Sequence, residues 1–426
     1  MSNNASNNSD KKVCIFCSGK MTRTKRIISS ENGSVICEDC ARKIVSFFDA
    51  VNTKNTSKEI QEIKFTGRPK PSEIKEMLDA WVIGQEEAKK DLAIAAYNHY
   101  KRLDDRGNNN DVDIQKSNIL LVGPTGSGKT YLAKTLAKAL NVPFAFADAT
   151  ALTQAGYVGE DVEDVIGRLL TAAGGDPNKA AYGMVYIDEI DKLARKKGQV
   201  GRDVSGEGVQ QALLKLLEGS VVEASVKSAL VKNGQMLAMG KATVPVDTKN
   251  ILFICGGAFD GMKEAVEAAR KEKSVIGFRN NVDEEKKNPL LGTIGPEELV
   301  EYGLTPELVG RLPVISMLEA PSKDALVSIL TEPKDALVKQ YQELMKKDGI
   351  ALEFTRQALD KIADAAILRK SGARGLRSVM EKVVKKAMYK LPDMPEVKKV
   401  VFDGDSVNDG VGHAFDESGK KIEWEG

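Results

Sequence analysis

Short apolar runs separated by polar or glycine-rich turns recur through the middle of the chain. Four of them are the clearest, at residues 119–122, 144–147, 184–187 and 251–255, and segments with helical spacing lie between them. Continuous apolar runs are typical of strands that are buried on both faces of a parallel sheet. The pattern therefore predicts an α/β layered domain.

After about residue 318 the pattern becomes mostly helical. Three faces of apolar residues at helical spacing follow one another. Their members are Leu337, Val338, Tyr341, Leu344 and Met345 in the first, Ala358, Leu359, Ile362, Ala363, Ala366 and Ile367 in the second, and Leu376, Val379, Met380, Val383, Val384 and Ala387 in the third. Short runs at 350–354 and 400–402 predict a small sheet. The segment after Asp403 is rich in Gly and Asp, which predicts a loosely ordered tail.

The composition is that of an ordinary globular protein and excludes several classes. Lys and Arg number 62 against 61 Asp and Glu, which gives a formal charge of +1 over 426 residues. This balance argues against bulk binding of polyanions, and the composition excludes a disordered or fibrous chain. The longest segment without Asp, Glu, Lys or Arg, residues 117–128, is too short to cross a bilayer. Residues 1–10 lack the apolar core of a secretory signal, so we expect a cytoplasmic location without membrane contact.

Four of the five cysteines form two closely spaced pairs near the N-terminus. Cys14 and Cys17 make the first Cys-x2-Cys pair, and Cys37 and Cys40 make the second. Two such pairs can supply four thiolates to a tetrahedral structural Zn²⁺. Two disulfides are the competing interpretation, but a cytosolic protein would not keep them oxidised. A zinc module of this kind can bind nucleic acid, and a role in protein contact or dimerisation is at least as well supported.

The decisive motif is a complete phosphate-binding loop of the form G-x4-G-K-[ST]. It consists of Gly123, Pro124, Thr125, Gly126, Ser127, Gly128, Lys129 and Thr130. The motif follows an apolar run and opens a predicted helix, which is the context that it requires. Its glycines let backbone N–H groups approach phosphates, while Lys129 would reach the β and γ phosphates and Thr130 would bind Mg²⁺. We include Tyr131, the next residue, in the predicted nucleotide site.

Two adjacent carboxylates end the apolar run at 184–187. Successive side chains of a strand point in opposite directions, so Asp188 and Glu189 can serve two roles at one site. Asp188 would complete the Mg²⁺ shell, and Glu189 would polarise the attacking water. Together with Lys129, this pair predicts ATP hydrolysis rather than binding alone.

Two arginines are candidates for contacts with the γ phosphate. Arg311 lies near the end of the α/β domain, and Arg374 lies just before a helix of the second domain. Phosphoryl transfer benefits from cations that face the leaving phosphate. Spacing in the sequence does not decide whether either arginine reaches the nucleotide.

In combination, these motifs resemble those of the ClpX family, the AAA+ ATP-dependent unfoldase subunits of the Clp protease. The resemblance covers roughly residues 11–402. It rests on the two cysteine pairs, residues 82–85, the phosphate loop, residues 156–161, the 188–189 strand end and residues 202–208, 310–313 and 372–377. The family implies a homohexameric ring that uses ATP and Mg²⁺, unfolds protein substrates and translocates them through a central pore into the Clp peptidase.

The resemblance also implies a fold and a domain order. The fold is an AAA+ P-loop NTPase with a parallel sheet, a C-terminal mostly helical small domain and an N-terminal treble-clef or ribbon-like zinc module. The predicted divisions are a zinc-binding domain at 11–50, a linker at 51–64, a large ATPase domain at 65–318, a small helical domain at 319–402 and a tail at 403–426.

Roles at the nucleotide follow from the same resemblance. Val82 and Ile83 would line the adenine pocket. Arg311 would be the arginine finger that is offered to the ATP of the neighbouring subunit. Arg374 would be the sensor that couples the nucleotide state to rotation of the small domain. The predicted catalytic set is therefore Lys129, Asp188, Glu189 and Arg311.

Three further segments would contact proteins. Tyr157 and Val158 would form a pore loop, in which an aromatic ring grips a polypeptide without reading its sequence and the flanking glycines permit movement. Val204 and Ser205 resemble a second pore loop. The tripeptide Ile276, Gly277 and Phe278 lies in charged and polar surroundings and resembles the loop that docks on the Clp peptidase. Adaptor proteins would bind through the zinc domain.

One departure from the family and two alternatives remain. Between residues 218 and 247 the family usually carries an Arg-Lys-His loop at the pore entrance, but the two histidines of this chain are His99, expected on a helix surface, and His413. The sequence therefore does not predict which substrate tags are recognised. One alternative is a nucleic-acid-remodelling AAA+ ATPase whose zinc ribbon grips DNA. The other is a zinc-dependent adaptor with a degenerate ATPase, which conflicts with the intact catalytic set. No nucleic acid partner is expected.

Overall fold

The computed structural model describes residues 13–15, 17, 27–29, 34–41, 69–104, 114–153, 160–195, 206–226, 231–232, 235–236, 242–262, 294–369 and 372–424. The chain divides into two compact units, Met1–Gly67 and Arg68–Gly426. Within the described residues, no helix is both long enough and apolar enough to span a membrane.

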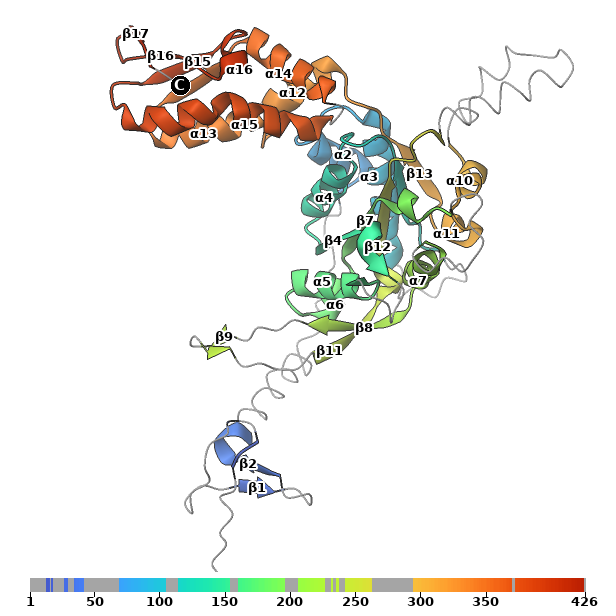
Figure 1. Ribbon diagram of the computed structural model, residues 1–426. Coiled ribbons are helices and arrows are strands. Elements are labelled where there is room, and N and C mark those ends of the chain that lie inside the picture. Colours follow the sequence, from blue (N-terminus) through green and yellow to red (C-terminus); the bar gives the residue numbers. More distant parts are fainter. Residues whose placement is uncertain are drawn as a thin grey trace, which may run out of the picture. The chain divides into compact units, whose positions relative to one another are not determined.

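The first unit contains a small antiparallel hairpin. Its strands are β1 (Ile27–Ser29) and β2 (Val35–Cys37), and Ile27 lies opposite Cys37 in the register. A helical segment at residues 38–41 follows β2 directly (Figure 1). The buried side chains at its centre are Cys14, Cys37 and Cys40. A unit with so little apolar core is unusual unless a metal or a disulfide stabilises it.

A parallel five-stranded sheet forms the centre of the second unit. Its strand order is β13-β3-β12-β7-β4. The strands are β3 (Ile119–Val122), β4 (Phe144–Asp148), β7 (Met184–Asp188), β12 (Leu252–Gly257) and β13 (Val314–Met317). The four predicted strands are confirmed with shifts of at most two residues at their ends. β13, in which Ser316 interrupts the apolar run, was not predicted.

Helices cover both faces of this sheet. One face packs against α5 (Asp164–Ala172), α7 (Glu207–Glu218), α10 (Pro296–Tyr302) and α11 (Pro306–Gly310) in a single apolar cluster. On the other side, α3 (Glu86–Asp104) contacts β3 and β13, and α4 (Lys129–Ala139) contacts β7 and β12, with α2 (Pro71–Asp79) packed on both helices (Figure 1). Because the sheet is buried on both faces, its strands are continuously apolar, as the sequence pattern indicated. We call this part, up to β13, the ATPase lobe.

An antiparallel hairpin extends from the ATPase lobe. It pairs β8 (Val221–Val226) with β11 (Ala242–Asp247), and Val221 lies opposite Asp247. Between them lie the short strands β9 (Val231–Lys232) and β10 (Gln235–Met236). A 3-10 helix, η3 (Thr248–Asn250), then leads into β12.

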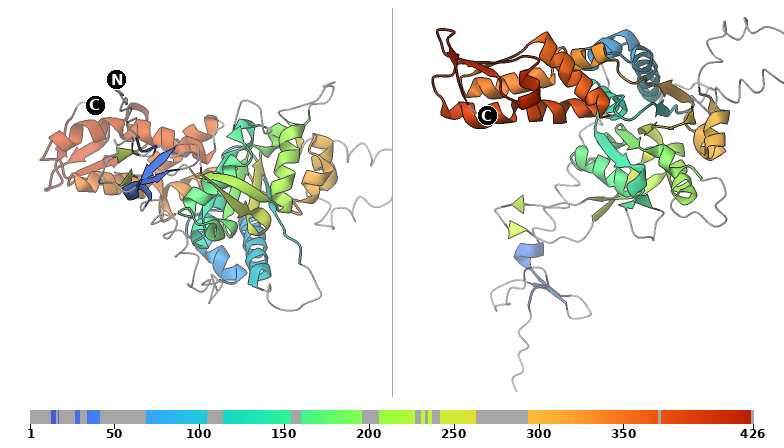
Figure 2. Two further views of the ribbon diagram at one scale, coloured as in Figure 1. Left: turned by 90° about the horizontal axis from the view of Figure 1, so that it is seen from below. Right: turned by 45° about the horizontal axis from the view of Figure 1, so that its top comes forward.

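The remaining residues form a second lobe with its own core. The C-terminal lobe contains α12 (Lys323–Thr331), α13 (Leu337–Lys347), α14 (Arg356–Leu368), α15 (Ala373–Lys390) and α16 (Ser406–Asp409). Its sheet has the order β14-β15-β16-β17, with β14 (Ala351–Phe354), β15 (Lys399–Phe402), β16 (His413–Phe415) and β17 (Lys421–Ile422). The strands lie beside the helices in both views (Figure 2). The helical C-terminal region of the prediction is confirmed. The predicted domain boundaries stay predictions.

The expectation of a loosely ordered segment after Asp403 is wrong. β16 pairs with β15, and β17 pairs with β16, so this segment completes the sheet of the C-terminal lobe. Asp403 accepts hydrogen bonds from Ser406 and contacts His413 at 2.9 Å, and Trp424 donates to the Gly412 carbonyl at 2.7 Å. Long-range pairing orders a segment whose Gly and Asp content favours turns.

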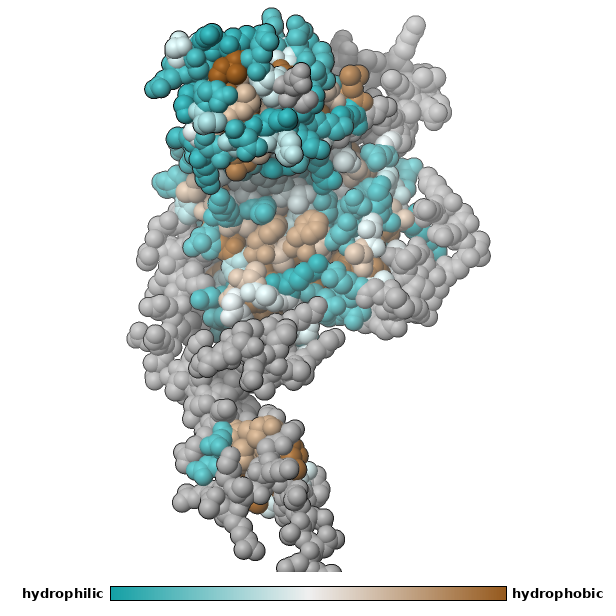
Figure 3. Space-filling model, turned by 60° about the vertical axis from the view of Figure 1, so that its left-hand side comes forward, coloured by the Kyte–Doolittle hydropathy of each residue, from teal (hydrophilic) through white to brown (hydrophobic). Residues whose placement is uncertain are grey.

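Three side chains lie where the sequence pattern did not place them. Leu344 and Ile367 were assigned to apolar faces, but they are 45% and 44% exposed. Figure 3 shows that the visible face of the C-terminal lobe is mostly hydrophilic with isolated hydrophobic residues, which is ordinary for a protein surface. His99 was expected on a helix surface, but it is buried and its Nε2 lies 2.9 Å from the Asn250 carbonyl oxygen. It shares the buried face of α3 with Leu92, seven positions earlier.

Candidate nucleotide-binding and hydrolysis site

The phosphate loop connects β3 to α4 without an intervening element. Gly126 and Gly128 have left-handed backbones with φ of 82° and 99°, which non-glycine residues rarely adopt. A Cβ atom on Gly123 would meet the Leu318 carbonyl oxygen at 2.4 Å. These three glycines are therefore required by backbone conformation or by close approach. The helix that follows begins at Lys129 and directs its N-terminus at the loop.

Lys129 is buried under the loop that it ends. Its Nζ donates to the carbonyl oxygens of Gly123 and Pro124 at 2.5 and 3.1 Å. Burial lowers the pKa of the Lys129 ammonium, and the nearby Asp188 carboxylate opposes that shift. The ammonium therefore lies inside the phosphate loop. The oxygens of a bound phosphate could take the place of these two carbonyl oxygens as its partners.

Thr130 and Asp188 meet at the end of β7. The Thr130 Oγ1 donates to Asp188 Oδ2 at 2.8 Å. The other oxygen, Oδ1, accepts from the Tyr186 hydroxyl at 3.1 Å and from the Glu189 N–H at 3.0 Å. Burial raises the pKa of Tyr186, and the charge of Asp188 adds to it. A hydroxyl and a carboxylate held side by side are the oxygen donors that Mg²⁺ uses in nucleotide sites.

Glu189 follows the last residue of β7 in a strained conformation. Its φ is 56°, in the left-handed region that is unusual for a residue with a side chain. It begins the 3-10 helix η2 (Ile190–Leu193). Such outliers concentrate at functional sites, where the surrounding structure holds the side chain in one direction.

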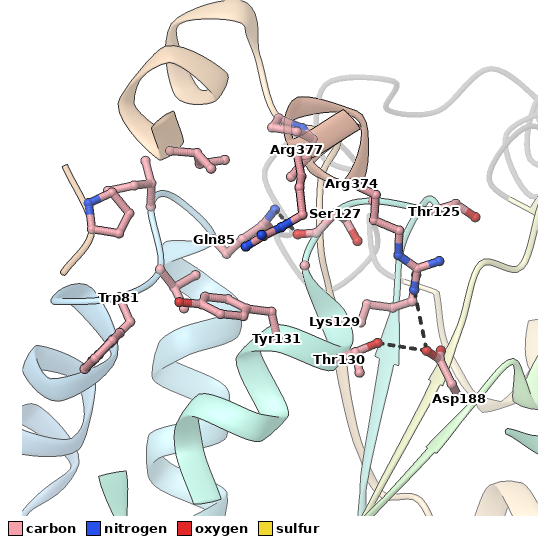
Figure 4. A pocket seen from close by; sticks show the side chains of 18 of the residues that line it. Trp81, Gln85, Thr125, Ser127, Lys129, Thr130, Tyr131, Asp188, Arg374 and Arg377 are labelled. Atoms are coloured by element: carbon pink, nitrogen blue, oxygen red, sulfur yellow. Dashed lines mark hydrogen bonds and ion pairs between the residues drawn. The ribbon is translucent and has the colours of Figure 1, made fainter. Parts of the chain in front are cut away.

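These groups line one cavity of about 490 Å³. Its walls come from the phosphate loop, from the turn that carries Val82 and Ile83, from the Asp188–Glu189 strand end and from the C-terminal lobe. In Figure 4, Thr130 and Arg374 both point toward Asp188, and the dashed lines mark their contacts. The structure therefore brings most of the predicted nucleotide residues to one place. The cavity residues among them are Val82, Ile83, Thr125, Gly126, Ser127, Gly128, Lys129, Thr130, Tyr131, Asp188, Glu189 and Arg374.

Arg374 enters this cavity from the first turn of α15. Its Nη2 lies 4.0 Å from Asp188 Oδ2, and its side chain is 66% exposed. The turn before it approaches the phosphate loop closely, because a Cβ atom on Gly372 would meet the Gly126 carbonyl oxygen at 2.9 Å. Gly372 has φ of 53°, and the Ala373 N–H donates to the same Gly126 oxygen at 3.2 Å. The C-terminal lobe thus contacts the phosphate loop through its backbone.

Arg311 lies elsewhere in the ATPase lobe. It ends α11 and forms an ion pair with Glu218, with Nη2 and Nε at 2.8 and 3.1 Å from the same carboxylate oxygen. The side chain is 48% exposed. Arg311 is not among the described residues that line the cavity. Within one chain, the structure does not bring it to the phosphate loop.

Several cavity residues were not assigned a role from the sequence. Asp191 is buried, accepts from the Ala258 N–H at 3.1 Å and raises the pKa of Lys192. In the sequence, the feature that could have identified Asp191 is its position two residues after Glu189. Gln85 contacts Ser127, and its position directly after Gly84 in the 82–85 motif could have identified it as a residue of the site. Trp81, Asp335 and Arg377 are also among the residues that line the cavity, and Tyr131 donates to Asp335 at 2.8 Å.

The four N-terminal cysteines gather into one cluster. The Sγ atoms of Cys14, Cys17, Cys37 and Cys40 all lie within 4.8 Å of one another, and none forms a disulfide. Tetrahedral Zn–S bonds of about 2.3 Å would place sulfur atoms about 3.8 Å apart. Cys17 and Cys37 have Sγ atoms 3.9 Å apart, and the Cys37 N–H donates to Cys14 Sγ at 3.4 Å. This donor set fits a zinc ion.

The remaining candidates lie outside the described residues. They are the first pore loop with Tyr157 and Val158, the second with Val204 and Ser205, and the docking tripeptide Ile276, Gly277 and Phe278. They stay predictions. β5 (Leu152–Thr153) and β6 (Glu160–Asp161) flank the first of these segments and pair with each other in parallel.

Known proteins similar to this chain cover nearly all of it. The AAA domain (Cdc48 subfamily) matches residues 114–315. The C-terminal, D2-small domain, of ClpB protein matches residues 322–401. The protein named ATP-dependent Clp protease ATP-binding subunit ClpX from Porphyromonas gingivalis is 46% identical over 90% of this chain and 92% of its own length. The protein of the same name from Bacteroides fragilis is 45% identical over 91% of this chain and 93% of its own length.

Proposed function

Because the chain belongs to the ClpX family of ATP-binding subunits of the ATP-dependent Clp protease, we propose that it unfolds protein substrates and feeds them to a Clp peptidase. It is an ATP hydrolase of the AAA type, and AAA ATPases use ATP with Mg²⁺. One observation carries the proposal beyond family membership. The phosphate loop, the Thr130–Asp188 pair and Arg374 from the C-terminal lobe line a single cavity, so hydrolysis and a movement of this lobe would share one site.

The cavity residues divide the chemistry among them. Lys129 would bind the β and γ phosphates, and the Thr130 hydroxyl with the Asp188 carboxylate would hold Mg²⁺, which neutralises phosphate charge when it is bound. Glu189 would accept a proton from the attacking water. Val82 and Ile83 would contact the adenine from the turn after α2.

Arg374 and Arg311 would respond to the γ phosphate from two directions. Arg374 already faces Asp188, the proposed Mg²⁺ ligand, at 4.0 Å, so a γ phosphate there would draw it in and move α15 with it. Arg311 is half exposed and is not among the described residues that line its own cavity, which supports a contact with the ATP of a neighbouring subunit. We therefore infer a homohexameric ring with nucleotide sites between subunits.

Translocation would depend on the segments at 156–161 and 202–208, and peptidase docking on Ile276, Gly277 and Phe278. Tyr157 supplies an aromatic surface, and apolar contact of this kind is independent of substrate sequence. The nucleic-acid-remodelling alternative predicts basic pore loops, whereas residues 156–161 carry an aromatic and two acids. A cytoplasmic location stays a prediction.

The function is tested by mixing the protein with ATP, a Clp peptidase and a tagged fluorescent protein. We expect fluorescence to fall only when ATP and the full chain are both present, and peptides to appear only when the peptidase is added. Persistent fluorescence during active ATP hydrolysis would contradict the unfoldase assignment. Binding of double-stranded DNA with a steep salt dependence would favour the alternative.

The pore-loop assignment predicts a separation of two activities. In Tyr157→Ala we expect ATP hydrolysis to stay within about twofold of wild type, while the rate of fluorescence loss falls by roughly tenfold or more because the aromatic grip is absent. Tyr389→Ala is the matched control, since Tyr389 is 78% exposed at the end of α15 and should affect neither rate. Equal unfolding by Tyr157→Ala and wild type would refute the assignment.

We further propose that Cys14, Cys17, Cys37 and Cys40 bind one structural Zn²⁺, and that this module contacts substrates or adaptors. The buried cysteines make up most of its core, so the metal would supply most of its folding free energy. The ATPase lobe has its own apolar cluster, so its fold would not depend on the metal.

Removal of zinc should therefore unfold the module alone. On adding a strong chelator, we expect one Zn²⁺ per chain to be released and four thiols to become reactive, while the main thermal unfolding transition and ATP hydrolysis persist. Cys255 is the internal control, because it is fully buried in β12 and burial raises the pKa of its thiol to about 12. Global loss of helical signal on chelation would contradict this separation.

A further inference from the structure

The side-chain amide of Gln85 bridges two distant parts of the chain. Its Nε2 donates to the Glu319 carbonyl oxygen at 2.8 Å and to the Ser127 carbonyl oxygen at 3.2 Å. Its Oε1 accepts from the Glu319 N–H at 3.1 Å. One glutamine thus binds both backbone groups of Glu319 and, with the same nitrogen, one carbonyl of the phosphate loop. Figure 4 shows Gln85 beside Ser127. We call this arrangement the Gln85 clasp.

The two partners of the clasp have different functions. Ser127 belongs to the phosphate loop, and its carbonyl shares a peptide plane with the Gly128 N–H. In a trans peptide the two groups point in opposite directions, so a bond that fixes the Ser127 oxygen also fixes the direction of the Gly128 N–H. Backbone N–H groups of this loop are the ones that receive phosphate oxygens. The clasp therefore holds an amide that nucleotide binding uses.

Glu319 lies in the connection between the two lobes. It follows β13, which ends at Met317, and precedes α12, which begins at Lys323. The preceding residue is tied to the sheet, because the Leu318 N–H donates to the Val122 carbonyl oxygen at 2.7 Å. Glu319 is thus the first residue beyond the sheet, where the chain turns toward the C-terminal lobe.

The backbone of Gln85 has an uncommon, strained conformation at the turn that carries the Gln85 clasp. Gln85 has φ of 59° and follows Gly84 with φ of 68°, so two successive residues are left-handed at the turn between α2 and α3. A glutamine in this conformation is uncommon, and such strain persists where the surroundings hold it. Its carbonyl oxygen accepts from the Lys89 N–H at 2.9 Å, which anchors the turn to the first turn of α3.

We propose that Gln85 is a positioning residue that couples phosphate binding at the loop to the position of the connection between the lobes. Phosphates that bind the Gly128 N–H polarise the Ser127 peptide and strengthen the hydrogen bond from Gln85. The same amide then holds Glu319 more firmly, so the connection is ordered when the loop is filled. By reciprocity, a displaced connection weakens nucleotide binding. The coupling rests on the nucleotide site and does not depend on the protein substrate.

The chain offers a matched pair of glutamines for the test. Gln85→Met removes the amide and keeps the length of the side chain. Gln342→Met makes the same change outside the cavity, on α13, where the Gln342 amide donates to the Leu352 carbonyl oxygen within the C-terminal lobe at 3.0 Å. Gln85→Asn keeps an amide and a residue that tolerates a left-handed backbone, but it is one methylene too short to reach both partners.

Two measurements on the full chain test the coupling. The first is the Kd of a fluorescent ADP analogue, which we expect to rise about tenfold in Gln85→Met and to stay within about twofold in Gln342→Met. The second is hydrogen exchange of the backbone amides at residues 318–320, with and without ADP. In wild type and Gln342→Met, we expect ADP to slow this exchange. In Gln85→Met, exchange should be faster and independent of ADP.

The outcomes separate coupling from simple support of the fold. If Gln85→Met does not fold, Gln85→Asn takes its place in both measurements with the same expectations. Unchanged ADP affinity together with ADP-dependent protection in either Gln85 variant would overturn the proposal. Equal effects of Gln85→Met and Gln342→Met would also overturn it, because the loss of any side-chain amide, and not of the clasp, would then be responsible. Neither readout requires a substrate or a peptidase, so failure of the unfoldase proposal would leave this result intact.

Discussion

Glu189→Gln is expected to bind ATP normally and to hydrolyse it about a thousandfold more slowly, because general-base catalysis contributes roughly 10²- to 10⁴-fold. The amide has nearly the shape of the carboxylate but cannot accept a proton from water. The left-handed turn at Glu189, with φ of 56°, holds the side chain at the end of β7 next to Asp188. Single-turnover hydrolysis and equilibrium ATP binding, measured on the same preparation, separate the two steps.

The control for this substitution is Glu353→Gln, which makes the same chemical change on β14, where Glu353 pairs with Lys399 at 2.8 Å. We expect it to leave hydrolysis unchanged. If Glu189→Gln still hydrolyses ATP at a rate close to wild type, the base is another group. Asp191 would then be the first to examine, because it is buried and lines the same cavity.

Arg311→Ala is expected to reduce hydrolysis by about a thousandfold, which is the lower range for loss of an arginine finger. Arg311 is not among the described residues of its own cavity. A loss of hydrolysis in Arg311→Ala would therefore show that each nucleotide site is incomplete without a neighbouring subunit. Affinity for ATP should change far less, since the finger acts on charge that develops during the reaction.

Mixing two inactive variants tests the contact between subunits directly. A ring that contains both Arg311→Ala and Glu189→Gln subunits has some interfaces where an intact Glu189 meets an intact neighbouring Arg311. We therefore expect the mixture to regain hydrolysis that neither variant shows alone. Absence of any recovery, with mixed rings confirmed by mass, would contradict an arginine supplied by the neighbour.

Glu218→Gln serves as the control for the ion pair that Arg311 forms within its own chain. The contact is half exposed on both sides, and such pairs contribute about 0–1 kcal/mol to stability. We expect Glu218→Gln to stay folded and active. If it loses as much activity as Arg311→Ala, the arginine supports the fold of α11 and not the reaction.

Local patterns predicted the parts of the fold whose signal lies in neighbouring residues. The run at Ile119–Val122 is continuously apolar because β3 is buried on both faces, and the predicted strand agrees with β3 residue for residue. The phosphate loop was recognisable because its glycines are required by the backbone, as the φ of Gly128 shows. The spacing of the cysteine pairs likewise reflects a cluster that forms within one small unit.

Contacts between residues that are far apart in the sequence could not be predicted from local patterns. Nothing near His99 in the sequence indicates that the Asn250 carbonyl oxygen accepts a hydrogen bond from its ring, and nothing after Asp403 indicates that β16 pairs with β15. The clasp between Gln85 and Glu319 joins residues 234 positions apart. The sequence supplied the residues of the candidate site, whereas the approach of the C-terminal lobe to Gly126 follows only from the folded chain.

The sheet of the C-terminal lobe has a consequence for shortened forms of the chain. β15 pairs with β14 on one side and with β16 on the other, so a chain that stopped at Phe402 would leave one edge of β15 without partners. A bare strand edge is a template for pairing with another copy, and natural proteins usually cover such edges. Residues 403–424 cover this one, and they therefore protect the C-terminal lobe against aggregation.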